Sequence, residues 1–259
     1  MSAPTIRFDD GAVYERMTGR WSGRECFYRL ALAAAQFAVG RHRLRQWCVY
    51  TVAGRALRPY GHRRRGSVRR MDFARERLAT PVAQFRQGDA MALPYPNETF
   101  DAAVMALVVF FIPEPPRGVA EMARVVRPGG FAAAYVWDLV SGGGPSEAIT
   151  IRMRDMGFAP PKPPRAEAST PEGLQALWIQ AGFVDLEARV IRARRAFGDF
   201  EDYWSTTIVA PNIAPKLATM TPADVSQLKS RVRQQVPIEA SGRVTIEARA
   251  NAIVGRRSR

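Results

Sequence analysis

Two apolar stretches separated by a helix-like segment constrain the fold of this chain more than any other feature. Phe100–Phe111 is almost continuously apolar, as expected for a parallel strand that is buried on both faces. Pro115–Val126 carries apolar residues at helical spacing, and Phe131–Leu139 is a second apolar strand. The intervening Pro128-Gly129-Gly130 is expected to end the helix, because proline cannot continue it and glycine accepts the turn. This order predicts a right-handed βαβ unit of a parallel sheet, and hence an α/β fold.

Capping residues and alternating patterns predict further elements along the chain. Thr170 is typical of a helix N-cap, with Pro171 at the first helical position, and this helix is expected to run to Ala181. Further helices are predicted at residues 146–156, 199–209 and 222–235. Further strands are predicted at residues 82–86, 183–192 and 242–253, the last of them antiparallel, and residues 157–169 are expected to be irregular.

The positive charge of the chain is concentrated in one segment. Arg24–Arg70 holds twelve arginines against one acid, Glu25, and so carries +11 of the total net charge of +14. A basic cluster such as Arg63–Arg65 could bind nucleic-acid phosphates. Few aromatic residues are interleaved with these arginines, and a solvated basic insert is the stronger interpretation. We therefore expect no specific nucleic-acid partner.

The sequence favours neither a membrane protein nor a metal protein. No apolar run approaches the ~20 residues of a membrane span, and residues 1–10 lack the pattern of a signal peptide. The expected location is the cytoplasm, with no membrane partner. The possible zinc ligands have spacings that fit no ligand-pair pattern, so no metal site is expected. These residues are Cys26, His42, Cys48 and His62.

Phe85–Asp138 resembles the second half of a class I S-adenosylmethionine-dependent methyltransferase domain, in the small-molecule branch called methyltransferase type 11. The resemblance extends over roughly residues 12–23 and 71–255. It implies a Rossmann-like sandwich with a mostly parallel sheet, formed by a single domain of residues 1–259 with helical insertions on the substrate side within residues 140–235. The matching pieces are Gly88-Asp89-Ala90, Leu93-Pro94, Phe100-Asp101 and Glu121–Gly130.

The resemblance also implies a cofactor, S-adenosylmethionine, and a reaction, methyl transfer to a small molecule. Asp89 would accept a hydrogen bond from the adenine amino group, and Ala90 and Met91 would flank the adenine ring. Leu107 and Val108 would line the methionine end of the cofactor. Two alternatives stay open: Asp89 could be a turn residue that caps a helix, and Leu107 and Val108 could be ordinary core residues.

No catalytic residue is assigned from the sequence. A methyltransferase mainly aligns its acceptor with the methyl group of the cofactor, and a general base is optional. Asp138, Tyr203 and Trp204 are candidates near the expected pocket mouth, and each has a structural interpretation of at least equal weight.

The strongest motif of this family, a Gly-x-Gly-x-Gly loop after the first strand, is absent from the chain as written. Glycine is required there because the backbone must approach the cofactor closely. Residues 38–70, where the loop is expected, contain no Gly-x-Gly. We hypothesise that about residues 24–70 are translated out of frame. Some codon choices for Arg41–Cys48 encode Asp-Ile-Gly-Cys-Gly-Asn-Gly when they are read one base forward. In the same way, codons for Arg63–Arg69 can be read as a sequence that ends in glutamate.

The sequence therefore leaves three functional hypotheses open. The first is a methyltransferase that acts on a small molecule. The second is an inactive methyltransferase-like remnant whose first βαβ portion is disrupted, and this hypothesis predicts weak or no binding of S-adenosylmethionine. The third is a basic protein that binds nucleic acid, which predicts an affinity with a steep dependence on salt.

Overall fold

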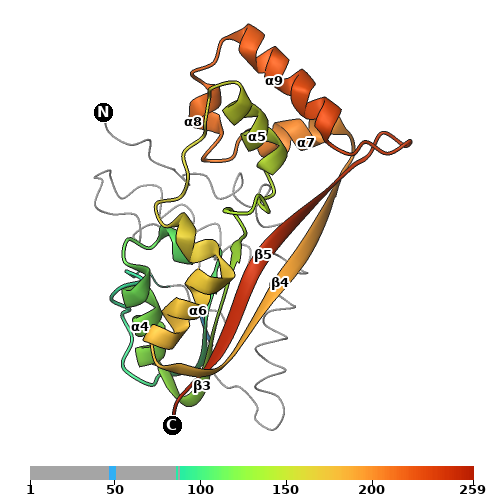
Figure 1. Cartoon of the computed structure of the whole chain (residues 1–259). Helices are drawn as coiled ribbons and strands as arrows, with labels where there is room; N and C mark the ends of the chain where they lie inside the picture. The colour runs from blue at the N-terminus through green and yellow to red at the C-terminus, as the bar shows by residue number, and fades with distance from the viewer. Residues whose placement is uncertain (1–46, 51–85, 87) are drawn as a thin grey trace.

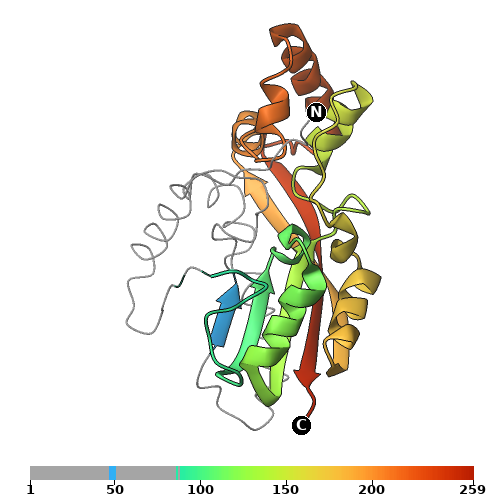
Figure 2. The same cartoon turned by 90° about the vertical axis from the view of Figure 1, so that its left-hand side faces the viewer.

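A five-stranded sheet forms the centre of the part of the chain that the computed structural model describes, which is residues 47–50, 86 and 88–259 (Figures 1 and 2). Its order is β1-β2-β3-β5-β4. β2 is parallel to β1 and β3, whereas β5 is antiparallel to both β3 and β4. The bounds of the strands are Trp47–Tyr50, Phe100–Ala106, Val126–Trp137, Phe183–Phe197 and Val244–Arg257 for β1 to β5. The α/β class and the mostly parallel sheet are confirmed, and so is the antiparallel last strand.

The unit formed by β2, helix α4 (Pro115–Val125) and β3 confirms the expected strand–helix–strand order. α4 buries Val119, Met122 and Val125. The predicted strand Phe100–Phe111 is too long, because β2 ends at Ala106 and residues 109–111 form the short helix η3. All of these residues except Asp101 are buried, so an apolar run alone cannot distinguish the end of a strand from a buried turn of helix.

The Pro128-Gly129-Gly130 sequence lies within β3 and does not end α4, so this prediction is wrong in its detail. The helix stops at Val125, because Val126 has the extended backbone of a strand. The pairing of β3 with β2 shifts register between Phe100 and Ala102, which indicates a bulge. Gly129 has a φ of 75°, a left-handed conformation that suits glycine.

Helix α6 (Pro171–Gln180) begins where the sequence predicts. The Thr170 side chain accepts a hydrogen bond from the Gly173 amide at 3.0 Å, which satisfies one free amide of the first turn. α6 lies beside α4 on one face of the sheet (Figure 1). The indole Nε1 of the buried Trp178 donates to the Ala132 carbonyl of β3 at 3.1 Å. The preceding segment is irregular as predicted, except for the short helix η4 (Ala166–Ser169).

β4 and β5 continue as a long ribbon toward a group of four helices at one end of the sheet (Figure 1). These strands are longer than predicted, and the sequence prediction lacked α8. The ribbon shares one apolar cluster with the helices, which includes Met153, Trp204, Leu228 and Val244. The helices are α5 (Glu147–Asp155), α7 (Phe200–Thr207), α8 (Ala214–Leu217) and α9 (Pro222–Gln235).

Some predictions fall outside the described residues. They include the strand at residues 82–85, the possible zinc ligands, and the out-of-frame hypothesis apart from the backbone of β1. β1 occupies the sheet position next to β2. Among the residues that are described, no helix combines the length and apolar character needed to cross a bilayer.

Candidate functional site

A tight turn at Asp89–Ala92 presents the acidic residue predicted to bind the cofactor. The Asp89 Oδ1 atom accepts a hydrogen bond from the Met91 amide at 2.9 Å, and the Asp89 carbonyl accepts one from the Ala92 amide at 3.0 Å. The carboxylate is half-buried, and no described residue donates to its Oδ2 atom. Asp89 therefore stabilises its own turn, and no helix follows for it to cap. One carboxylate oxygen is still available to an external donor.

Leu107 and Val108 lie directly after the carboxyl end of β2 and are both buried. Leu107 has a φ of 58°, which is uncommon for a residue with a bulky side chain. Its amide donates to the Tyr135 carbonyl of β3 at 2.8 Å. Val108 belongs to the same apolar cluster as Ala90, whereas Leu107 belongs to the other cluster, with Trp137. The structure thus gathers Ala90 and Val108 in one cluster and separates Leu107 from them.

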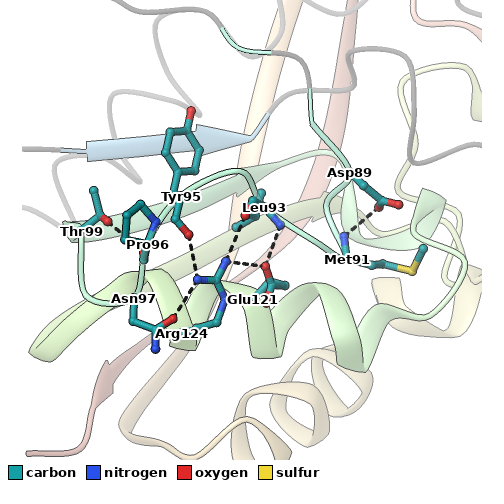
Figure 3. A network of polar contacts seen from close by, with 9 residues as sticks. All are labelled: Asp89, Met91, Leu93, Tyr95, Pro96, Asn97, Thr99, Glu121 and Arg124. Carbon is teal, nitrogen blue, oxygen red and sulfur yellow. Dashed lines mark hydrogen bonds and ion pairs between the residues drawn. The ribbon is translucent and has the colours of Figure 1, made fainter.

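A network of polar contacts links helix α4 to the loop between the Asp89 turn and β2 (Figure 3). The Glu121 Oε2 atom accepts from the Leu93 amide at 2.7 Å. The Arg124 guanidinium donates to both carboxylate oxygens of Glu121 at 2.7 Å. It also donates to the carbonyls of Leu93 and Tyr95, at 3.1 and 2.8 Å, and to the Asn97 side chain at 2.9 Å. No role for this pair is evident from the sequence alone.

The Glu121 carboxylate is held in its charged form. Hydrogen bonds from the Arg124 guanidinium lower the pKa of Glu121 below its ordinary value, and the Leu93 amide acts in the same direction. A depressed pKa means that the stabilisation from this carboxylate is present at neutral pH and is lost only when the pH falls through that lowered value. The network is therefore fully charged under physiological conditions.

Asp138, at the end of β3, has structural partners. Its Oδ1 atom accepts from the Ser141 amide at 3.2 Å, and its Oδ2 atom lies 3.6 Å from the Arg249 guanidinium. Arg249 also donates to the Ser141 carbonyl at 2.9 Å. The carboxylate thus closes the glycine-containing turn that follows β3. Trp204 packs in the apolar cluster around α7.

Tyr203 is buried in the same cluster, and its hydroxyl has no hydrogen-bond partner. Burial raises the pKa of the phenol well above its ordinary value, because the ionised form would lose its hydration. The hydroxyl is therefore protonated at neutral pH, which argues against a role as a general base.

Replacing Tyr203 with phenylalanine should stabilise the protein by about 1 kcal/mol at neutral pH, because the buried, unpaired hydroxyl is removed. The wild type should also lose stability above pH ~10, where the unfolded chain ionises Tyr203 and the folded chain does not. The Tyr203→Phe variant should lose less stability over the same rise in pH. Urea unfolding at pH 7 and pH 10.5 measures both effects. Thr207→Val is the control, because it removes a formed hydrogen bond to the Tyr203 carbonyl and should not stabilise. A less stable Tyr203→Phe would contradict this account.

Comparison with known proteins links the sheet and the Asp89 turn to one family. A family model described as a methyltransferase domain matches residues 54–134, which include the Asp89 turn, β2 and α4. Residues 54–134 of the chain are therefore similar to a methyltransferase domain. The sequence resemblance is thereby confirmed, and the methyl donor of this class is S-adenosylmethionine. The match contains every residue predicted to contact the cofactor, although none of those contacts is tested by it.

Two curated methyltransferases illustrate the sequence similarity. The chain is 43% identical over 88 residues to a phosphatidylethanolamine N-methyltransferase of Cereibacter sphaeroides, a match that covers 30% of this chain and 42% of the relative. It is 36% identical over 80 residues to a demethylmenaquinone methyltransferase of Desulfitobacterium hafniense, covering 27% of this chain and 32% of the relative. The chain thus matches less than half the length of these methyltransferases.

The similarity in fold extends over more of the chain. The YcgJ protein of Bacillus subtilis superimposes with a TM-score of 0.50 at 17% identity, and the match covers 90% of this chain and 99% of that protein. At this identity the similarity shows the fold alone. The chain therefore shares its overall fold with a known structure.

Proposed function

We propose that this protein transfers a methyl group from S-adenosylmethionine to a small-molecule acceptor. The observation that carries the proposal is the methyltransferase-domain match, because it includes the Asp89 turn and the carboxyl end of β2. In open α/β sheets, ligands bind outside the carboxyl ends of the parallel strands. The bound cofactor supplies an electrophilic methyl carbon, which passes to a nucleophilic atom of the acceptor and leaves S-adenosylhomocysteine.

The described residues fit the adenine end of the cofactor. Asp89 has a carboxylate oxygen available to accept from the adenine amino group, and its position is fixed by the turn. Ala90 and Met91 would flank the ring, and Leu107 and Val108 would line the methionine end. The left-handed backbone of Leu107 supports this role, because strained conformations concentrate at ligand sites.

The acceptor site is proposed to lie beneath the helices within residues 140–235, on the substrate side of a single domain. Phosphatidylethanolamine and demethylmenaquinone, named for the two relatives, suggest ethanolamine-containing and hydroquinone compounds as first acceptors to test. The proposal includes a cytoplasmic location and no membrane or specific nucleic-acid partner. No general base is assigned, because Asp138 is paired and Tyr203 is held protonated.

Titration calorimetry with S-adenosylmethionine and S-adenosylhomocysteine tests the proposal directly. Saturable binding, followed by transfer of a labelled methyl group to one of these acceptors, would support it. The missing glycine loop gives the opposite expectation, so a complete lack of binding would favour the inactive remnant. Binding to nucleic acid with a steep salt dependence would favour the third hypothesis.

Asp89→Ala should weaken binding of S-adenosylmethionine about tenfold or more, because a hydrogen bond to a charged group contributes about 1.5–3 kcal/mol. Asp89→Asn should weaken it less, since its one amide oxygen can keep one of the two contacts, with the Met91 amide or with the adenine amino group. Glu172→Ala, at an exposed acid of α6, is the control and should leave the Kd unchanged. Equal affinity in the wild type and Asp89→Ala would show that Asp89 only shapes the turn.

A further inference from the structure

The Glu121–Arg124 pair of α4 makes more contacts with the loop at residues 93–98 than an ordinary helix-surface ion pair would. Arg124 donates from all three of its guanidinium nitrogens to five acceptor atoms, which belong to Glu121, Leu93, Tyr95 and Asn97. Its backbone carbonyl accepts from the Glu98 amide at 2.9 Å. The side chains of Arg124 and Glu121 are only 30% and 17% exposed. The pair therefore fixes both ends of the loop on the helix.

Figure 3 shows two sets of contacts, one between α4 and the loop and one within the Asp89 turn, and the chain backbone from Leu93 to Ala92 joins them. Leu93 is bound through its amide by Glu121 and through its carbonyl by Arg124. The residue before it, Ala92, donates from its amide to the Asp89 carbonyl. The side chain of Asp89 then accepts from the Met91 amide. The turn is thus held between its internal hydrogen bonds and the fixed position of Leu93.

A second ion pair on the same helix shows what the loop contacts add. Arg117 and Glu114 have the same spacing of three residues and an N–O distance of 3.0 Å, but their side chains are 59% and 56% exposed. Their side chains bond to each other and, among the described residues, not to the loop. An exposed pair of this kind contributes little to stability. The Glu114–Arg117 pair is therefore a matched control for the Glu121–Arg124 pair.

We infer that Glu121 and Arg124 are positioning residues for the cofactor, because they hold the Asp89–Met91 segment in its binding conformation before the cofactor arrives. This inference rests on the proposed function for the identity of the ligand. If the segment becomes mobile and only about a tenth of the molecules retain the competent turn, the apparent Kd rises about tenfold. The side chains that react or contact the acceptor are unchanged, so kcat at saturating cofactor should stay constant.

Hydrogen exchange of the cofactor-free protein tests the positioning role on its own. In Arg124→Ala, the amides of Met91, Ala92 and Leu93 should exchange at least about tenfold faster than in the wild type, because local opening becomes easier. Arg117→Ala should leave them unchanged. Arg124→Lys should fall in between, since one ammonium group cannot reproduce the fork of a guanidinium. Unchanged exchange at these amides in Arg124→Ala would overturn the inference.

Calorimetry with S-adenosylmethionine supplies the second measurement. The Kd should rise about tenfold in Arg124→Ala, less in Arg124→Lys, and not at all in Arg117→Ala. Faster exchange with an unaltered Kd would overturn the link to the cofactor. Should Arg124→Ala fail to fold, as judged by circular dichroism, Arg124→Lys and Glu121→Gln provide the same comparison. If the wild type binds no cofactor, the proposed function fails, and the exchange rates still decide whether the pair fixes the turn.

Discussion

Trp178→Ala is expected to destabilise the protein by about 3–5 kcal/mol, the range for removing a large aromatic side chain from a core. Trp178 is completely buried between α6 and the sheet. Its indole Nε1 bonds the Ala132 carbonyl, and its ring lies 6.0 Å from that of Phe183. The substitution removes these contacts and leaves a cavity against β3 and β5. Urea unfolding followed by circular dichroism measures the loss.

Two neighbouring substitutions show where that loss originates. Trp178→Phe keeps an aromatic ring but removes the donor to Ala132, so its cost should be smaller than that of alanine. Ile179→Ala changes the next residue of α6, whose side chain is 58% exposed, and should alter stability by no more than about 0.5 kcal/mol. Alanine has a higher helix propensity than either residue it replaces, so a similar loss for Ile179→Ala would contradict an origin in the core packing of Trp178.

Gly130→Ala should destabilise the protein by about 3 kcal/mol, at the upper end of the usual cost of overpacking. An added Cβ would lie 2.6 Å from the Asp101 carbonyl oxygen and 2.9 Å from the Arg127 carbonyl oxygen. Both are backbone atoms at the bulge between β2 and β3, so neither can move aside without disturbing the sheet. The unfolding free energy in urea measures this cost.

The adjacent glycine separates crowding from backbone conformation. An added Cβ at Gly129 meets nothing within 4 Å, but the residue has a φ of 75°. Gly129→Ala should therefore cost only about 1 kcal/mol, the penalty for a left-handed residue with a side chain. If the two alanine variants were equally stable, the close approach of backbone atoms at Gly130 would not explain the cost of a side chain there.

The elements that the sequence predicted well are those defined by neighbouring residues. α6 starts at Pro171 as expected, because the Thr170 side chain and the proline act within a single turn. α9 likewise begins after Thr221, which forms a capping box with Asp224. In both cases the chemistry that sets the boundary lies within four residues.

The features that the sequence did not predict depend on contacts between distant segments. The left-handed conformation of Leu107 is held by the carbonyl of Tyr135, in the neighbouring strand. The spacing of Glu121 and Arg124 is visible in the sequence as a helix-surface pair. Their partners in the loop lie 27–31 residues earlier, however, so the sequence does not show that the pair binds this loop. Among the residues predicted to contact the cofactor, Asp89 is the one whose local structure, a turn, could be anticipated from the sequence.

The place of β5 in the sheet has a consequence for synthesis on the ribosome. β5 lies between β3 and β4, although both of those strands precede it in the chain. Until residues 244–257 have emerged, β3 and β4 each have an unpaired edge that can associate with other chains. The nascent chain is therefore exposed to misassembly from the emergence of β3 until that of β5, and closure of the sheet is a late, non-local folding event.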